Sequence, residues 1–294
     1  MEIRVLRYFL AVAREENITK AAEVLHITQP TLSRQLTQLE EEAGVRLFHR
    51  GARKITLTNE GILLRRRAEE ILELVNKTEQ ELALSEEQIE GTITIGCGEL
   101  AAVQTLAGLC DAFHAKYPRV RFDLYTATAD YVIEQMDKGL VDIGLLLEPV
   151  DMEKYEFIRL GIKERWIVLM KPDDALAALE AVTASDLEKL PLMLPRRLGV
   201  QSEVASWFGD KYENLNVVFT SNLSTNSAVM VEKGLGYSLV IEGGVPFLDQ
   251  KKITYRPLSP ELSATSVIAW KRQQPFCRAA EKFIEQIRYL LEVS

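Results

Sequence analysis

The chain has 294 residues, of which 47% are hydrophobic and 27% charged, a composition typical of a soluble globular protein with two or three domains. No run of 18 apolar residues occurs, which excludes a membrane-spanning helix. The first 17 residues carry arginines scattered through an amphipathic pattern and lack the small-residue cleavage site of a signal peptide, so they predict a helix. The odd number of cysteines (Cys97, Cys110 and Cys277) and the absence of metal-type spacing argue against a disulfide framework or metal site and indicate the reducing cytoplasm. A redox role for Cys97 stays open.

The formal net charge of −8 hides an uneven distribution along the chain. Residues 1–58 contain nine basic and seven acidic side chains, which gives +2, so the remaining residues carry −10. Such an asymmetry is a weak indication of nucleic-acid binding by the N-terminal part.

The N-terminal segment predicts two helices joined to a third by a short turn. Apolar side chains recur at helical spacing in the first helix, at Leu6, Phe9, Leu10 and Ala13. Thr19 is the expected cap of a second, short helix that buries Ala21, Ala22 and Leu25. The turn at His26 and Ile27 is short enough to set the next helix at a steep angle.

A third helix is expected to begin after Thr28, with Pro30 tolerated in its first turn. Its buried side is predicted to contain Leu32, Leu36, Leu39 and Ala43. The opposite side and the first turn carry polar groups, at Gln29, Thr31, Ser33, Arg34, Thr37 and Gln38. Such donors and acceptors suit base edges in the major groove of DNA. The segment from Val45 to Thr58 then reads as two short strands around a basic tip, which is typical of a wing that contacts the DNA backbone or minor groove.

These residues together resemble a known family. The segment from Ile18 to Arg50 reads ITKAAEVLHITQPTLSRQLTQLEEEAGVRLFHR, and it is followed by Arg53 and by L-T-x-x-G at Leu57–Gly61. This pattern closely resembles the signature of the LysR-type transcriptional regulators. The resemblance implies that Gln29, Thr31 and Arg34 read bases, that Pro30 packs on the DNA, and that Ser33, Arg50 and Arg53 anchor phosphates or a groove. Residues 1–58 are therefore expected to form a winged helix-turn-helix domain.

Residues 59–90 predict one long helix, because they contain no proline and no glycine after Gly61. Residues with heptad-like spacing form a seam at Leu64, Ala68, Ile71, Val75, Thr78, Leu82, Ser85 and Ile89. LysR-type proteins pair through such a linker helix, so the resemblance implies a homo-oligomer, either a dimer or a tetramer. Packing of the helix on its own chain is the alternative.

From residue 91 onward strands and helices alternate, which predicts an α/β fold with buried parallel strands. Strands are expected at 92–97, 120–125, 141–147, 166–170, 192–194, 216–219, 237–241 and 267–270. Helices are expected at 100–115, 129–138, 200–208, 224–233 and 275–291. The pattern is similar to a two-lobed periplasmic-binding-protein fold, with lobe one at 91–162 plus 267–294 and lobe two at 163–266.

The family resemblance implies a small-molecule effector bound between the two lobes, near the carboxyl ends of strands and the starts of helices. The positions carried over are Gly98, Glu99, Leu100, Ala101, Thr126, Ala127, Thr128, Glu148, Pro149, Arg196, Arg197, Gln201, Ser224 and Thr225. Many relatives have a small hydroxyl residue where this chain has Glu99. A carboxylate there competes with an anionic ligand: either it receives a ligand amine or hydroxyl, or it is a surface acid that stabilises the start of its own helix. Arg196 and Arg197 favour a carboxylate or phosphate ligand, so the charge of the ligand stays open.

Two other functions have weaker support in the sequence. Gly96, Gly98 and Ala101 match a weak dinucleotide fingerprint, but the end of the second strand carries no acidic residue, since Asp123 lies in mid-strand. A ligand-binding module without a DNA function conflicts with the first 60 residues. No nucleophile, base and orienting group can be named, so we expect a cytoplasmic transcription factor that is not an enzyme and needs no cofactor. Its expected partners are a pseudo-palindromic promoter site in double-stranded DNA, a small-molecule effector and a second copy of the chain; RNA polymerase is an optional further partner.

Overall fold

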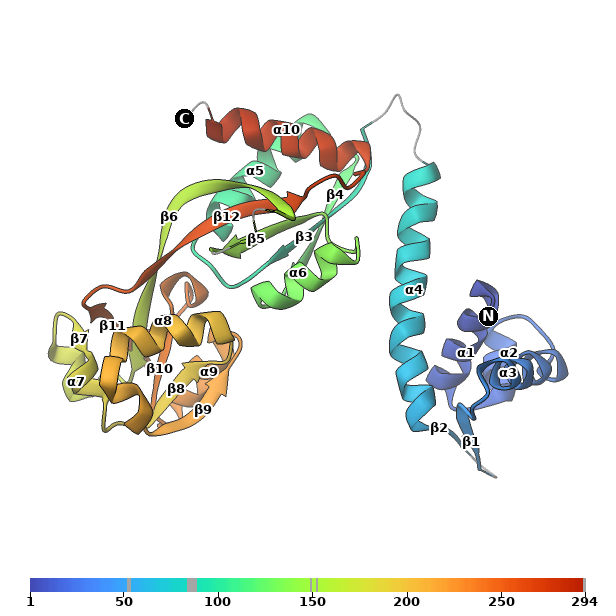
Figure 1. Ribbon diagram of the computed structural model, residues 1–294, viewed down its shortest axis with the longest axis horizontal. Helices are drawn as coiled ribbons and strands as arrows, with labels where there is room; N and C mark the ends of the chain where they lie inside the picture. The colour runs from blue at the N-terminus through green and yellow to red at the C-terminus, as the bar shows by residue number, and fades with distance from the viewer. Residues whose placement is uncertain (52–53, 84–88, 149, 152, 293–294) are drawn as a thin grey trace. The chain divides into compact units, whose positions relative to one another are not determined.

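The computed structural model describes all residues except 52–53, 84–88, 149, 152 and 293–294 (Figure 1). The chain folds into two compact units, Met1–Ala83 and Leu84–Ser294, which are described separately below. The long helix after the wing belongs to the N-terminal unit, where the sequence suggested a separate linker domain at 59–90.

The N-terminal unit begins with three helices, α1 (Ile3–Glu15), α2 (Ile18–Val24) and α3 (Gln29–Ala43). Helix α2 starts two residues earlier than predicted, because the Asn17 side chain, and not that of Thr19, accepts its capping bond. The helices share an apolar core that includes Val5, Leu6, Phe9, Val12, Ala21, Ala22, Leu32, Leu36 and Leu39. Leu6, Phe9, Ala21, Ala22, Leu32, Leu36 and Leu39 are buried as predicted, and the two alanines let α2 approach its neighbours closely. Leu10, Ala13 and Leu25 are only half-buried, and Val5 and Val12 complete the buried face of α1 instead.

The end of α3 differs from the prediction. Ala43 is exposed, and the side chain that continues the buried face is Glu40, which is 6% exposed. Its Oε1 accepts hydrogen bonds from the backbone N–H groups of Leu47 (2.7 Å) and Phe48 (3.2 Å). The carboxylate therefore ties the start of the wing to α3, which satisfies two backbone donors at a buried site.

The wing is an antiparallel pair of short strands, β1 (Phe48–Arg50) and β2 (Ile55–Leu57), as predicted. The N–H of Ile55 donates to the carbonyl oxygen of Glu16, which ties the wing to the end of α1. The wing is thus held on two sides, by Glu40 and by α1.

The predicted apolar seam of helix α4 (Asn59–Ala83) is buried in one part and exposed in another. Ala68 is fully buried and Leu64 packs on the core of its own unit, so this part of the seam is intramolecular, which was the alternative interpretation. Further along the same seam Ile71 and Leu82 are exposed, and next to them Leu63 and Leu74 are exposed as well, so this part of the helix has apolar side chains without cover in its own unit. Ser85 lies outside the described residues. The helix is also shorter than predicted, since residues 89 and 90 are not helical.

The first lobe of the C-terminal unit contains the parallel strands β3 (Gly91–Cys97), β4 (Val120–Thr126) and β5 (Ile143–Leu147), in the order β4-β3-β5. Helices α5 (Val103–Lys116) and α10 (Arg278–Glu292) cover one face of this sheet, and helix α6 (Ala129–Asp137) covers the other (Figure 1). The sheet therefore has both faces buried, as its continuous apolar strands predict.

The second lobe repeats this arrangement with strands β8 (Leu192–Pro195), β9 (Val217–Ser221) and β10 (Tyr237–Ile241). They are parallel in the order β10-β8-β9 and are connected by helices α8 (Leu198–Phe208) and α9 (Ser224–Glu232). Smaller elements that the sequence did not predict complete the lobe: η1 (Ala175–Ala178), β7 (Val182–Thr183), α7 (Ala184–Leu187), η2 (Gly209–Asn214), η3 (Glu242–Gly244) and β11 (Thr254–Ser259).

Two long strands run from one lobe to the other, β6 (Tyr155–Met170) and β12 (Ser263–Lys271) (Figure 1). The first part of β6 pairs antiparallel with β12, and its last residues pair antiparallel with β10 and β11. The sheets are therefore mixed, where the sequence indicated parallel strands. The sequence predicted only 166–170 as a strand, because the charged first part of β6, interrupted by Gly161, shows no apolar run.

Candidate functional site

The first candidate site is the polar face of α3. Gln29, Pro30, Thr31 and Arg34 are exposed and Ser33 is half-buried, as expected for side chains available to DNA. The helix begins with Thr28, whose Oγ1 lies 3.4 Å from the N–H of Thr31 and 2.8 Å from its Oγ1.

The positive charge that Arg34 places on this face is available for binding. The Arg34 guanidinium makes no ion pair with any residue that the structure describes. Gln29, Pro30, Ser33, Arg34, Thr37, Gln38 and Glu41 line one shallow groove. Of the two wing arginines, Arg50 is placed by its backbone in β1, and Arg53 lies outside the described residues.

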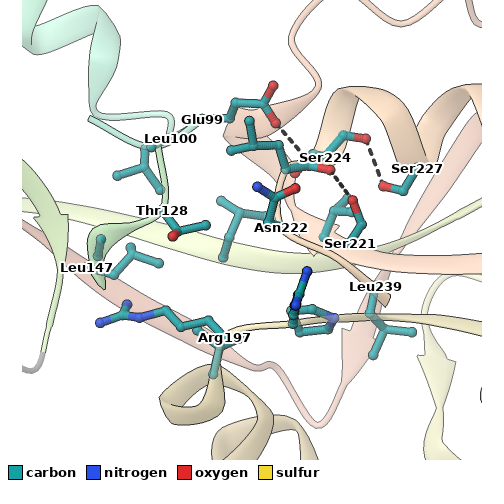
Figure 2. A pocket seen from close by; sticks show the side chains of 18 of the residues that line it. Glu99, Leu100, Thr128, Leu147, Arg197, Ser221, Asn222, Ser224, Ser227 and Leu239 are labelled. Atoms are coloured by element: carbon teal, nitrogen blue, oxygen red, sulfur yellow. Dashed lines mark hydrogen bonds between the residues drawn. The ribbon is translucent and has the colours of Figure 1, made fainter. Parts of the chain in front are cut away.

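The second candidate site is a cavity of about 110 Å³ in the C-terminal unit, between its two lobes (Figure 2). Its walls come from the ends of β5, β8 and β10, the starts of α6 and α9, and the crossing strand β6. Most of the lining is apolar, and includes Leu100, Leu145, Leu146, Leu147, Trp166, Leu194, Val200, Leu239, Val240 and Ile241. The polar groups are few, at Thr128, Ser221, Asn222, Ser224, Ser227 and Ser238, together with the charged residues Glu99, Arg196 and Arg197.

Glu99 bridges the lobes at one side of the cavity. Its Oε2 accepts hydrogen bonds from the backbone N–H of Ser224 (2.5 Å) and of Thr225 (3.2 Å), and Oε1 accepts one from the Thr225 hydroxyl (2.5 Å). The carboxylate thus occupies the N-terminal end of α9, where free N–H groups and the helix dipole favour a negative charge (Figure 2).

Two further contacts hold the lobes together. The Arg197 side chain is 16% exposed, and its guanidinium donates to the carboxylate of Asp130 at 3.0 Å. Near Glu99 the backbones approach closely, since a Cβ placed on Gly243 would lie 1.9 Å from the N atom of Ala101. The positive end of α9 and the Arg197 guanidinium are therefore already paired with acids of the chain itself, whereas Arg196, also part of the cavity wall, is exposed to solvent.

Trp166, one of the residues of the cavity wall, carries an unsatisfied indole donor. Trp166 lines the cavity and is 3% exposed, and its Nε1 has no hydrogen-bond partner among the described residues. A buried donor without a partner is uncommon, because it loses its bond to water and gains nothing in return.

The segment that carries Glu99 is positioned by a second, fully buried carboxylate. Glu164 on β6 accepts bonds from the N–H groups of Ala101 (2.9 Å) and Ala102 (3.0 Å) and from the Ser266 hydroxyl (2.7 Å). These bonds connect β6 and β12, which cross between the lobes, to the turn before α5. The sequence did not indicate this role for Glu164, because a charged side chain is usually expected on the surface.

The structure brings together eight of the fourteen expected effector positions in the cavity wall: Gly98, Glu99, Leu100, Ala127, Thr128, Arg196, Arg197 and Ser224. Three others border a neighbouring groove instead: Ala101, Thr126 and Thr225. Glu148 and Gln201 are not part of the cavity wall. Glu148 pairs with Arg159 at 2.8 Å, and Gln201 donates to the carbonyl oxygen of Pro195. Pro149 lies outside the described residues.

Lining residues that the sequence did not single out are Leu145, Leu146, Leu147, Trp166, Ser221, Asn222, Ser227 and Leu239. Most of them lie at or beyond the carboxyl ends of predicted strands, a position that could have signalled them. Trp166 could not be found in this way, because it lies at the amino-terminal start of a predicted strand and not at a carboxyl end.

Burial suppresses the reactivity of two cysteines. Cys97 is buried, and the loss of hydration raises the pKa of its thiol. Burial also raises the pKa of Cys110 to about 12. Both thiols are therefore protonated at neutral pH, which disfavours attack on a peroxide or a disulfide.

The fold and these two sites define a two-part transcription factor, with a winged helix-turn-helix unit and a two-lobed ligand-binding unit. Residues 3–62 match the family model "Bacterial regulatory helix-turn-helix protein, lysR family", and residues 86–292 match "LysR substrate binding domain". The chain belongs to the LysR family of DNA-binding transcriptional regulators.

Individual relatives agree with this assignment. The uncharacterized HTH-type transcriptional regulator YvbU of Bacillus subtilis is 30% identical over 99% of both chains. The Hca operon transcriptional activator HcaR of Escherichia coli is 30% identical over 92% of both chains. Among solved structures, full-length CbnR in complex with its target DNA superposes with a TM-score of 0.74 at 22% identity, covering 98% of this chain and 99% of that one. In the part of the chain that the structure describes, no helix is both long and apolar enough to cross a membrane.

Proposed function

We propose that α3 reads the bases of a promoter site through Gln29, Thr31 and Arg34, with Ser33, Arg50 and Arg53 on phosphates or in a groove. The observation that carries this proposal is the exposed polar face of α3, whose arginine has no ion-pair partner within the described residues. An unpaired guanidinium is free to bond a guanine bidentately, whereas one held by a carboxylate would first have to be released.

The test is DNA footprinting with purified protein on the promoter beside its own gene. Arg34→Ala is expected to lose about 1–3 kcal/mol of discrimination between the cognate site and sites changed at one base pair. The control is Arg119→Ala, since Arg119 pairs with Glu90 in the C-terminal unit. A footprint with the same sequence preference in both variants would contradict the proposed role of α3.

We further propose that the chain acts as a homo-oligomer on a pseudo-palindromic site. The exposed apolar side chains of α4, at Leu63, Ile71, Leu74 and Leu82, are suited to pairing with a second copy. Two copies place two recognition helices on one DNA molecule, which raises affinity through effective concentration. Replacing Leu74 by Glu is expected to convert the dimer to a monomer in sedimentation experiments; an unchanged mass would contradict this use of α4.

The cavity between the lobes is the proposed effector site, since it combines an apolar lining with a few convergent polar groups. A ligand there changes regulation only if it binds two arrangements of the protein with different affinity. We assign no catalytic role to the chain, and place its action in the cytoplasm, where its DNA target is.

A thermal-shift screen of metabolites tests the effector site. Any compound that binds should bind more weakly to Thr128→Ala and Ser224→Ala, which change the cavity wall. Thr220→Ala is the matched control, because Thr220 is an exposed residue of β9 outside the wall. Hits that bind all four proteins equally would place the effector site elsewhere.

A further inference from the structure

The size and lining of the cavity restrict the ligand. At about 110 Å³ it lies below the usual range for drug-sized ligands, and is closer to a cavity of about 150 Å³ lined by aliphatic and aromatic side chains that holds a benzene molecule. The apolar walls offer dispersion contacts and little compensation for a charge removed from water.

Two of the three charged residues in the cavity wall, Glu99 and Arg197, are already paired within the chain, and the third, Arg196, is exposed to solvent. The N-terminal end of α9 would attract an acidic ligand, but the Glu99 carboxylate occupies it with three hydrogen bonds. The guanidinium of Arg197 is held by Asp130. A carboxylate ligand at α9 would have to displace Glu99, leaving two negative charges close together at a half-buried site.

Trp166 indicates that the ligand is not a pure hydrocarbon but carries a hydrogen-bond acceptor. Its buried Nε1–H has no acceptor among the described residues, although the side chain forms part of the cavity wall. A ligand oxygen or nitrogen acceptor would satisfy it, whereas a hydrocarbon would leave it unpaired.

We propose that the effector is an uncharged, largely apolar molecule about the size of one six-membered ring, which presents a hydrogen-bond acceptor to Trp166 Nε1, and that Glu99 takes the place of a ligand acid group at α9. This inference rests on the proposed function of the cavity as the effector site. It proposes a neutral ligand where the sequence left the charge open between Glu99 and the two arginines, because Arg197 is paired with Asp130 and Arg196 is exposed to water.

Three probes of similar size separate these requirements: benzamide, benzoate and toluene. Benzamide and benzoate have the same shape and differ in charge, and toluene lacks an acceptor. The full-length protein labelled with ¹⁵N in its three tryptophans gives one indole N–H signal for each of Trp166, Trp207 and Trp270. Benzamide is expected to shift the Trp166 signal and to bind about tenfold more tightly than toluene, because it satisfies the buried donor. Benzoate is expected to bind at least about tenfold more weakly than benzamide.

Two variants test the individual contacts. Trp166→Phe removes the donor and should abolish the preference for benzamide over toluene. Trp207→Phe is its control, since the Trp207 Nε1 donates to the carbonyl oxygen of Pro260 and Trp207 is not part of the cavity wall. Glu99→Ser frees the end of α9 and should raise the affinity for benzoate about tenfold or more. Glu134→Ser, which removes an exposed carboxylate of α6 paired with Lys138, should leave it unchanged.

Several results would overturn the inference. These are benzoate binding to the wild type as tightly as benzamide, a benzamide preference that survives in Trp166→Phe, and no binding of benzamide at millimolar concentration. None of these results contradicts the proposed effector site if the metabolite screen yields a compound whose affinity falls in Thr128→Ala or Ser224→Ala. Loss of DNA binding in either tryptophan variant would reveal misfolding, and the Glu99→Ser variant then decides the question by itself.

Discussion

Replacing Glu164 by alanine is expected to destabilise the C-terminal unit more than any surface substitution. The carboxylate is fully buried and accepts three hydrogen bonds, from two backbone N–H groups and the Ser266 hydroxyl. Alanine leaves all three donors without this acceptor in a dry environment, at about 1–1.5 kcal/mol each. The expected loss in the free energy of unfolding is therefore about 3–5 kcal/mol, a large fraction of the stability of an ordinary domain.

Urea unfolding followed by tryptophan fluorescence measures this loss selectively, because all three tryptophans lie in the C-terminal unit. Glu164→Gln keeps one oxygen acceptor and should lose about half as much. Glu261→Ala is the matched control, since Glu261 is exposed and lies 3.6 Å from Lys163, and we expect a change within about 0.5 kcal/mol.

The same substitution should also affect the cavity. Glu164 fixes the N–H groups of Ala101 and Ala102, and Glu99 lies two residues before this turn. Glu164→Ala should therefore weaken benzamide binding as well as stability. A loss below about 1 kcal/mol would refute the reasoning, because it would mean that the three donors find other partners when the carboxylate is removed.

Three other predictions follow from single contacts. Glu40→Ala should lower the stability of the N-terminal unit by about 2–3 kcal/mol in calorimetry, because two buried N–H groups of the wing lose their acceptor; an unchanged melting temperature would contradict this. Gly243→Ala should separate the lobes at Ala101 and speed hydrogen exchange of the two amides that Glu99 caps; unaltered exchange would show that the backbone adapts locally. Cys97 and Cys110 should resist hydrogen peroxide at pH 7 and react faster as the pH rises toward their raised pKa values; sulfenic acid found at Cys97 by mass spectrometry at neutral pH would disprove this.

Most of the DNA-binding unit could be predicted from the sequence, because local signals determine it. The apolar spacing at Leu32, Leu36 and Leu39 and the cap at Thr28 place α3 correctly. The prediction was wrong where a tertiary contact overrides the local pattern. Ala43 was expected on the buried side but is exposed, and Glu40 is buried in its place because two wing amides need an acceptor.

In the C-terminal unit the strands with continuous apolar runs were predicted well, and β10 matches to the residue. The first part of β6 was missed, since its alternating charged residues give no apolar signal and its pairing with β12 joins segments about 100 residues apart. The cavity wall combines such distant segments, and this explains why only part of it was expected. Spacing along the chain carries no information about which loops of the two lobes meet.

Glu99 illustrates how a residue can be noticed in the sequence and still be misjudged. The sequence offered two interpretations, a surface acid at its own helix or a group that receives a ligand amine or hydroxyl. In the structure the carboxylate instead binds the start of a helix in the opposite lobe, through Ser224 and Thr225. A ligand that leaves this contact intact has to bind mainly through apolar contacts and the free donor of Trp166. A ligand that breaks the Glu99 contact must replace its three hydrogen bonds. A ligand that keeps this contact therefore holds the lobes together, whereas one that breaks it lets them separate.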